Sequence, residues 1–246
     1  MRRTDAGRIQ YPAGLSALER RLCRRMIVAT TSSFDIADCV IVSCSGGLDS
    51  TALVHAVGQG TRIHPNNNYG RKIDTTAVYL NHNLRPQEVK QEAAYVESLT
   101  REHLTFVTPA VLLDVPSGPS LQDRARYARY KALAELAPKF SVVMTAHNLN
   151  DNAETKLYQF LKGQKANGIP SFRRLDSTDV LSHVYLSRPL LQFSRKDIEV
   201  YARCFRLKWC EDSSNKTDHY ARNKIRHHLI PWIETNINSG IIKMLG

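Results

Sequence analysis

The sequence lacks several features that would assign it to a common protein class. It has five cysteines in 246 residues, none in a Cys-x-x-Cys pair, which argues against a zinc ribbon or a redox dithiol. No apolar run approaches membrane-spanning length, and no apolar signal-peptide core follows the basic N-terminus. We therefore expect a cytoplasmic protein without membrane contact, whose thiols are reduced core residues. The cysteines are Cys23, Cys39, Cys44, Cys204 and Cys210.

Acidic residues are also scarce relative to basic ones. The chain has 23 Asp and Glu against 34 Lys and Arg, which gives a formal net charge of +11. A polyanionic partner would explain this charge, because Lys and Arg that neutralise phosphates release counterions. A basic protein without such a partner is the alternative. The hydrophobic fraction of 42% is enough for a sizeable folded core.

A glycine loop is the feature around which the chain is organised. The string Ser-Gly-Gly-Leu-Asp-Ser at 45–50 follows an apolar run rich in β-branched residues and precedes a predicted helix. Glycines let the backbone approach an anion, and the helix N-terminus offers free N–H groups. The string lacks the Gly-Lys-Ser/Thr of a Walker loop. We predict a phosphate cradle, with an ordinary strand-to-helix turn as the alternative, made of Ser45, Gly46, Gly47, Leu48, Asp49 and Ser50.

Strand and helix patterns alternate along the chain. This order predicts an α/β fold, a parallel twisted sheet with helices on both faces, in which ligands bind beyond the carboxyl ends of the strands. We expect a helical lead-in at 1–36, a main domain at 37–215 and a basic helical C-terminal segment at 216–246. The predicted strands are 38–44, 75–80, 104–107 and 141–146. The predicted helices are 14–31, one that starts near 51 and runs to about 58, 87–103, 121–137, one that follows 147–155 and ends at 161, and 195–205 with Ser194 as its N-cap, and the segment 162–182 is predicted to be a loop.

Acidic side chains lie at two of the predicted strand ends. Asp49 lies inside the glycine loop, where a carboxylate beside phosphates favours an intervening divalent cation such as Mg²⁺. Asp151 and Glu154 are three residues apart at a helix start and share one face, which suits a cationic small molecule. The alternative for all three is a carboxylate that complements a helix N-terminus. His147 is a candidate proton carrier or adenine contact, or a structural histidine.

Basic side chains gather in two further places. Arg126 and Arg129 are three residues apart and can hold a phosphate or a carboxylate, or form a solvated helix face. A second group near the C-terminus combines cations with an aromatic ring, as a nucleic-acid contact does, although a surface charge run is the alternative. This group contains Tyr220, Arg222, Lys224, Arg226 and His227.

Together these strings resemble the tRNA(Ile)-lysidine synthetase family, a branch of the PP-loop ATP pyrophosphatase superfamily. The loop at 45–50 is similar to the family's SGGxDS, and six further strings follow in the family's order. The resemblance covers the chain from about Val40 to Ile233. The further strings are 81–86, 125–130, 146–155, 188–191, 211–215 and 222–227.

The resemblance implies a three-substrate reaction. The C2 oxygen of the first anticodon cytidine of tRNA(Ile) with a CAU anticodon attacks the α-phosphate of ATP, and free lysine then displaces AMP to give lysidine. It implies catalytic roles for Asp49, His147 and Asp151, nucleotide contacts from the loop, His82 and Arg222, and Mg²⁺ on Asp49. It implies lysine contacts from Arg126, Asp151 and Glu154, with a homodimer left open. The tRNA contacts that it implies are Arg129, Tyr220, Lys224, Arg226 and His227.

The sequence departs from the family pattern at Asn83, Gln122, Asn148 and Asn150. Two other hypotheses therefore stay open. One is another PP-loop ligase that modifies RNA or nucleotides, for example by thiolation, although no cysteines are paired in the sequence for it. The other is a degenerate PP-loop domain that binds nucleic acid without turnover, against which the retained acids at 49, 151 and 154 argue.

Overall fold

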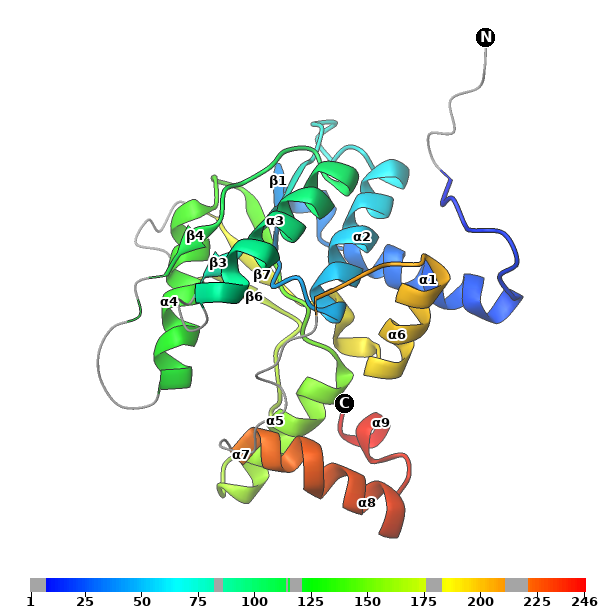
Figure 1. The fold of residues 1–246 in the computed structure, drawn as a ribbon, viewed down its shortest axis with the longest axis vertical. Coiled ribbons are helices and arrows are strands. Elements are labelled where there is room, and N and C mark those ends of the chain that lie inside the picture. Colours follow the sequence, from blue (N-terminus) through cyan, green and yellow to red (C-terminus); the bar gives the residue numbers. More distant parts are fainter. Residues whose placement is uncertain (1–7, 82–85, 114, 116–120, 176–182, 211–220) are drawn as a thin grey trace.

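The structure, a computed structural model, describes residues 8–81, 86–113, 115, 121–175, 183–210 and 221–246 (Figure 1). A five-stranded sheet with the order β2-β1-β5-β7-β6 forms its centre. The central strand β1 (Cys39–Ser43) runs parallel to β2 (Asp74–Val78) and β5 (Ser141–Met144), and β5 runs parallel to β7 (Tyr185–Ser187). Only the edge strand β6 (Phe172–Arg174) is antiparallel to its neighbour. The predicted parallel α/β fold is confirmed.

The sheet is buried on both faces because its strands are almost continuously apolar. Along β1, Val40 and Val42 face one hydrophobic core, and Cys39 and Ile41 face a second one. Helices α1 (Ala17–Thr31), α2 (Leu48–Ile63), α3 (Pro86–His103) and α6 (Arg195–Cys204) contribute to the first core, and α4 (Leu121–Leu136) covers the second. Figure 1 shows α1, α2 and α6 side by side and α4 on the opposite side of the sheet.

Local capping explains where several helices begin. Ser16 and Glu19 form a capping box that starts α1, and Ser194 and Asp197 form another that starts α6, as predicted for Ser194. Helix α5 (Leu149–Leu161) begins with a third box, made by Asn148 and Asp151. Helix α2 runs to Ile63 and is longer than the sequence predicted.

Three strand predictions need correction. The segment 104–107 is not a strand, because the backbone N–H groups of Thr105 and Phe106 both donate to the single carbonyl of Thr75 in β2 instead of forming a ladder. The strand in this region is β4 (Val111–Leu112), which pairs with β3 (Leu80–Asn81). The segment 162–182, predicted to be a loop, contains β6, and the sequence does not predict β7. Both are three residues long, too short for a periodic pattern.

The C-terminal helices pack on α5 and form a separate small core. They are α7 (Ala221–Lys224), a π-helical turn (Ile225–Leu229), α8 (Ile230–Asn236) and α9 (Ile241–Leu245). Their buried Ile225, Ile230 and Ile241 contact Leu157 and Tyr158. Figure 1 shows this group beyond the carboxyl edge of the sheet. The predicted domain boundaries stay predictions. Among the described residues, no helix is long and apolar enough to cross a membrane.

Candidate active site

The glycine loop joins the end of β1 to the start of α2. Gly46 has a φ of +82°, a conformation that a side chain disfavours, and Gly47 is the N-cap of α2 without any side-chain cap. Ser50 holds the loop from inside: its hydroxyl donates to the Gly47 carbonyl at 3.0 Å and accepts from the Ser45 N–H at 3.3 Å. The Thr51 hydroxyl donates to the Gly46 carbonyl at 3.2 Å. Among the residues that the structure describes, no side chain caps this helix N-terminus, whose N–H groups are suited to an anion.

Asp49, in the first turn of α2, has one carboxylate oxygen paired and one without a partner. Its Oδ2 accepts from Nη1 of Arg195 at 2.5 Å, while its Oδ1 is buried and has no hydrogen-bond partner in the described part of the chain. Burial raises the pKa of Asp49 to about 6, Arg195 opposes that rise, and Asp151 adds to it. A buried carboxylate oxygen without a hydrogen-bond partner is suited to bind a cation.

Asp151 and Glu154 lie at the start of α5 and share a guanidinium group. Arg226 donates from Nε to Oε1 of Glu154 at 2.6 Å, from Nη2 to Oε2 at 3.0 Å, and from Nη2 to Oδ1 of Asp151 at 2.9 Å. The other oxygen of Asp151 accepts from the Asn148 N–H at 2.9 Å. Burial raises the pKa of Glu154, and Arg226 opposes that rise. The two acids thus hold a cation, which here is a residue of the C-terminal segment, and Asp151 also caps the start of α5, the alternative that its position at a helix start allows.

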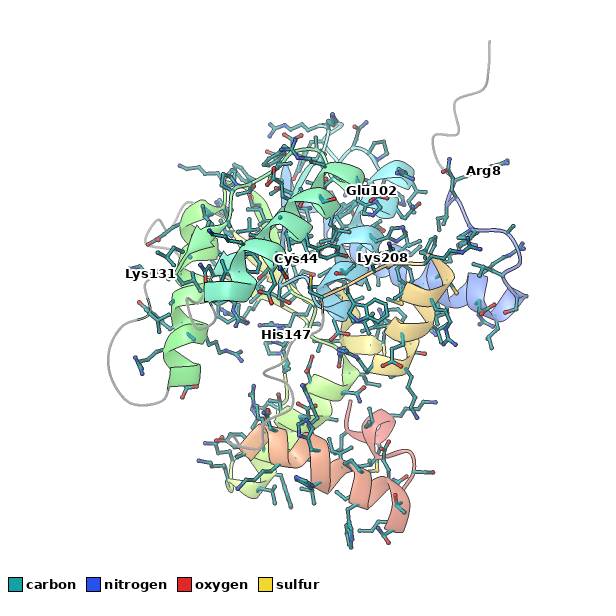
Figure 2. All side chains as sticks on the ribbon, in the orientation of Figure 1. Arg8, Cys44, Glu102, Lys131, His147 and Lys208 are labelled. Atoms are coloured by element: carbon teal, nitrogen blue, oxygen red, sulfur yellow. The ribbon has the colours of Figure 1, made fainter. Side chains whose placement is uncertain are left out.

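His147 follows β5 at its carboxyl end. Its Nδ1 is 2.9 Å from the Thr145 hydroxyl. Figure 2 shows it near Cys44, which follows β1, at the carboxyl edge of the sheet. Burial and then nearby positive charges lower the pKa of His147 to about 3, so the ring is neutral at physiological pH. Those charges belong to Arg188, Arg126, Arg129 and Arg222.

Tyr130 lies among three arginines next to His147. The guanidinium carbons of Arg126 and Arg173 are 5.4 and 5.3 Å from the centre of its ring, as in cation–π contacts. Arg188 donates from Nη2 to the Tyr130 hydroxyl at 3.1 Å and from Nη1 to the Pro170 carbonyl at 2.7 Å, and its buried Nε has no partner within the described ranges. This side of the site is therefore cationic and suited to phosphate or carboxylate groups.

The fold brings most of the predicted residues to one edge of the sheet. The acidic group of Asp49, Asp151 and Glu154 lies beside the glycine loop, and His147 lies with the arginines. Lys224 is exposed, and His227 lies in the π-helical turn. His82 and Tyr220 lie outside the described residues, as does the family departure Asn83.

Two functional candidates were missed in the sequence. Arg195 contacts Asp49, and Arg188 contacts Tyr130. A signal for Arg195 was present, because it is a cation in the first turn of α6, where the helix dipole disfavours positive charge. Asn148 and Asn150, two departures from the family pattern, act as hydrogen-bond acceptors: Asn148 caps α5, and Asn150 Oδ1 accepts from the Arg195 N–H at 3.0 Å.

A resident metal site made of protein ligands alone is not found in the part of the chain that the structure describes, because no three His, Cys, Asp or Glu side chains cluster there in a suitable way. Mg²⁺ commonly binds through one or two carboxylates together with substrate phosphates and water. Asp49, with its unpartnered buried oxygen beside the glycine loop, fits that kind of site.

Comparison with known proteins agrees with this geometry. The PP-loop domain family matches residues 19–233. The chain belongs to this family. It is 32% identical over 193 residues to the tRNA(Ile)-lysidine synthase of Coxiella burnetii, covering 77% of this chain and 40% of that protein. It is 35% identical over 189 residues to the tRNA(Ile)-lysidine synthase of Ralstonia nicotianae, covering 76% of this chain and 39% of that protein.

The chain therefore spans about 40% of the length of the curated relatives it matches. A solved structure, the U34-tRNA thiolase NcsA from Methanococcus maripaludis, is similar with a TM-score of 0.62, covering 92% of this chain and 76% of that one. At 13% identity this likeness supports the PP-loop fold of the chain and nothing finer.

Proposed function

We propose that this PP-loop protein is an ATP-dependent ligase that attaches free lysine to C2 of the first anticodon cytidine of tRNA(Ile) with a CAU anticodon. The cytidine would be adenylated first, and the products would be lysidine, AMP and pyrophosphate. One observation carries the proposal: the glycine loop, a pair of acids that holds a cation and a group of arginines around His147 meet at one edge of the sheet. We call these arginines the arginine-rich wall; they are Arg126, Arg129, Arg188 and Arg222. These three features suit the three substrates: the loop suits the phosphates of ATP, the acids suit the ammonium group of lysine, and the arginines suit the phosphates of tRNA.

The glycine loop would bind the β- and γ-phosphates of ATP through the N–H groups at the start of α2. Asp49 would hold Mg²⁺ beside those phosphates, and the cation would offset the negative charge of the leaving pyrophosphate. His147 is neutral and partly buried, which suits an adenine or sugar contact better than proton donation at neutral pH.

The acids at the start of α5 would bind the ammonium group of lysine. Asp151 and Glu154 already hold a guanidinium, which supports their use as a cation site. Lysine would share these acids with Arg226 or replace it. Arg126 would bind the lysine carboxylate or the α-phosphate, because both are planar or tetrahedral oxyanions that a guanidinium recognises.

The tRNA contacts would come from the arginine-rich wall and the C-terminal segment. Arg129, Lys224 and His227 are suited to backbone phosphates. Arg226 donates its N–H groups to Asp151 and Glu154, so we propose that it contacts these acids rather than tRNA. The first anticodon base must be unstacked to reach the loop, as single-stranded RNA bases are when proteins read them.

Thiolation is the second candidate, because the fold brings two cysteines to the loop. Cys210 donates its N–H to the Gly46 carbonyl at 2.9 Å, and Cys44 precedes the loop. Burial raises the pKa of Cys44 to about 11 and also raises that of Cys210. Both thiols are therefore protonated at neutral pH, which disfavours them as sulfur nucleophiles.

ATP–pyrophosphate exchange separates these functions. With the CAU tRNA(Ile), exchange should appear without lysine, because adenylation precedes lysine attack. It should disappear when the first anticodon base is uridine. Labelled lysine should then enter the tRNA with one AMP released per lysine. Exchange that leads to product only with a sulfur donor would support thiolation, and no exchange with any tRNA would support a binding domain without turnover.

A further inference from the structure

Arg195 lies where the glycine loop, α5 and α6 meet. Its Nη1 is 2.5 Å from Oδ2 of Asp49, its Nε is 3.6 Å from Oε1 of Glu199, and its backbone N–H donates to Oδ1 of Asn150 at 3.0 Å. The side chain is 44% exposed. It is thus anchored at its backbone and by two carboxylates, yet remains accessible to a ligand in the loop.

The position of this cation is electrostatically unusual. Arg195 is the first residue of α6, where the partial positive charge of the helix N-terminus repels a guanidinium. The start of α2, with its own partial positive charge, is also close to Arg195, because Asp49 lies in the first turn of α2 and pairs with Arg195. Asp49 pairs one oxygen with this guanidinium, and its other oxygen is buried and has no partner among the described residues, whereas Asp197 caps the start of α6. The guanidinium and the start of α2 therefore lie close together, an arrangement suited to a ligand with several negatively charged oxygens.

We propose that Arg195 binds the β- and γ-phosphates of ATP and stabilises pyrophosphate as the leaving group. This inference rests on the ATP chemistry of the proposed function. Asp49 would hold a divalent cation in place of the guanidinium, and the N–H groups of Arg195 would then donate to phosphate oxygens. A guanidinium forms two parallel hydrogen bonds to a phosphate, which a single ammonium group does not.

The reacting step assigns no proton to Arg195. The bond between the α-phosphorus and the oxygen that bridges to the β-phosphate breaks, and its electron pair stays on pyrophosphate. The cytidine O2 forms the new bond to the α-phosphorus. Arg195 donates hydrogen bonds to the pyrophosphate oxygens, where negative charge increases as the bridging bond breaks. It therefore acts on the leaving group and not on the nucleophile.

A purely structural role is the alternative. In that case Arg195 would only tie α6 to α2 through Asp49. Pyrophosphate and a non-hydrolysable ATP analogue contain the phosphates that Arg195 would bind, and AMP does not. A structural change of the loop would weaken the first two ligands as well, so Asp49→Asn, titrated with pyrophosphate without Mg²⁺, separates the two roles. It breaks the same tie between α6 and α2 but keeps the guanidinium, and only a structural role predicts weaker pyrophosphate binding in this variant.

The test is isothermal titration calorimetry with Mg²⁺ on the full chain and its Arg195→Gln and Arg195→Lys variants. Arg203→Gln is the matched control, because Arg203 is an exposed arginine at the other end of α6. We expect Arg195→Gln to weaken pyrophosphate and α,β-methylene-ATP binding by about tenfold or more, with AMP affinity unchanged. Arg195→Lys should recover part of the loss, and the control should match the wild type.

Unchanged pyrophosphate affinity in Arg195→Gln would overturn the inference. So would an equal loss for AMP and pyrophosphate, or a wild-type protein that binds no pyrophosphate. Failure of the proposed function looks different: pyrophosphate binding would depend on Arg195, yet no lysine would enter tRNA.

Discussion

The guanidinium of Arg226 forks onto the carboxylate of Glu154, with Nε 2.6 Å from Oε1 and Nη2 3.0 Å from Oε2. Glu154 is 6% exposed and Arg226 is 41% exposed, so the pair lies at the margin of the protein interior. It ties the C-terminal segment to the start of α5, in the same place where the proposed lysine site lies. A change to this pair should therefore alter both the stability of the protein and the access of lysine to the two acids.

Replacing Arg226 by methionine should destabilise the protein. The change leaves the buried Glu154 carboxylate without its cation, which we expect to lower the free energy of unfolding by about 2 kcal/mol, between the values typical of exposed and buried pairs. Urea denaturation measures this. The double variant Arg226→Met with Glu154→Gln should recover part of the loss. Lys243→Met, an exposed charge removal in α9, is the control. Wild-type stability of Arg226→Met would contradict the account.

The Asp49→Asn variant should be more stable than the wild type at neutral pH. Burial raises the pKa of Asp49 from 3.8 to about 6, so the folded protein binds this proton more tightly than the unfolded chain does. The stability contributed by Asp49 therefore falls as pH rises from about 4 to about 6 and stays low above that. We expect the stability difference between variant and wild type to grow by about 2 kcal/mol between pH 4.5 and pH 7. A difference independent of pH would show that the pKa is not raised.

His147 should stay neutral across the physiological range. Burial and the surrounding arginines lower its pKa to about 3, so its ring signals in NMR should not shift between pH 5 and pH 8. A His147→Gln variant assigns the signals. The neutral ring favours the folded state above the unfolded pKa of about 6.5, and this stability declines as the pH falls below it. A titration midpoint near 6.5 would overturn the assignment and restore His147 as a proton carrier.

Gly46 and Gly47 should respond differently to alanine. Gly46 has a φ of +82°, and an added Cβ would lie 3.4 Å from Cδ1 of Tyr95 and 3.6 Å from Sγ of Cys210. We expect Gly46→Ala to lower the free energy of unfolding by roughly 1–2 kcal/mol. At Gly47 the backbone is extended, and only Ser45 Oγ lies near an added Cβ, at 3.6 Å. Gly47→Ala should therefore leave stability nearly unchanged in thermal unfolding. Equal losses in both variants would contradict the loop geometry.

Local features of the chain were predictable from the sequence. The glycine loop, the Ser194 cap and the helix start at Asp151 depend on residues within a few positions, and each lies where its pattern predicted. The short strands β6 and β7 were missed, because three residues carry no alternation and are held by their neighbour in the sheet. The incorrect strand at 104–107 has strand-forming residues and lies beside β2, but the backbone N–H groups of Thr105 and Phe106 both donate to the carbonyl of Thr75, so it does not form a ladder.

The contacts between the site residues could not be predicted. Asp49 meets Arg195 across 146 positions, and Glu154 meets Arg226 across 72. Spacing along the sequence placed Asp151 and Glu154 on one face of a helix but could not name the cation they hold. It also could not reveal that His147 faces several arginines and is therefore neutral. These contacts are set by the sheet order and by how the C-terminal helices pack on α5.

The most direct test of the central claim is mass spectrometry of the nucleosides from tRNA(Ile) with a CAU anticodon. The tRNA is incubated with the protein, ATP, Mg²⁺ and isotopically labelled lysine. We predict that the first anticodon nucleoside becomes lysidine carrying the label, and that Asp49→Ala abolishes its formation. An unmodified cytidine after the full reaction, or a modification that does not contain the lysine label, would contradict the account.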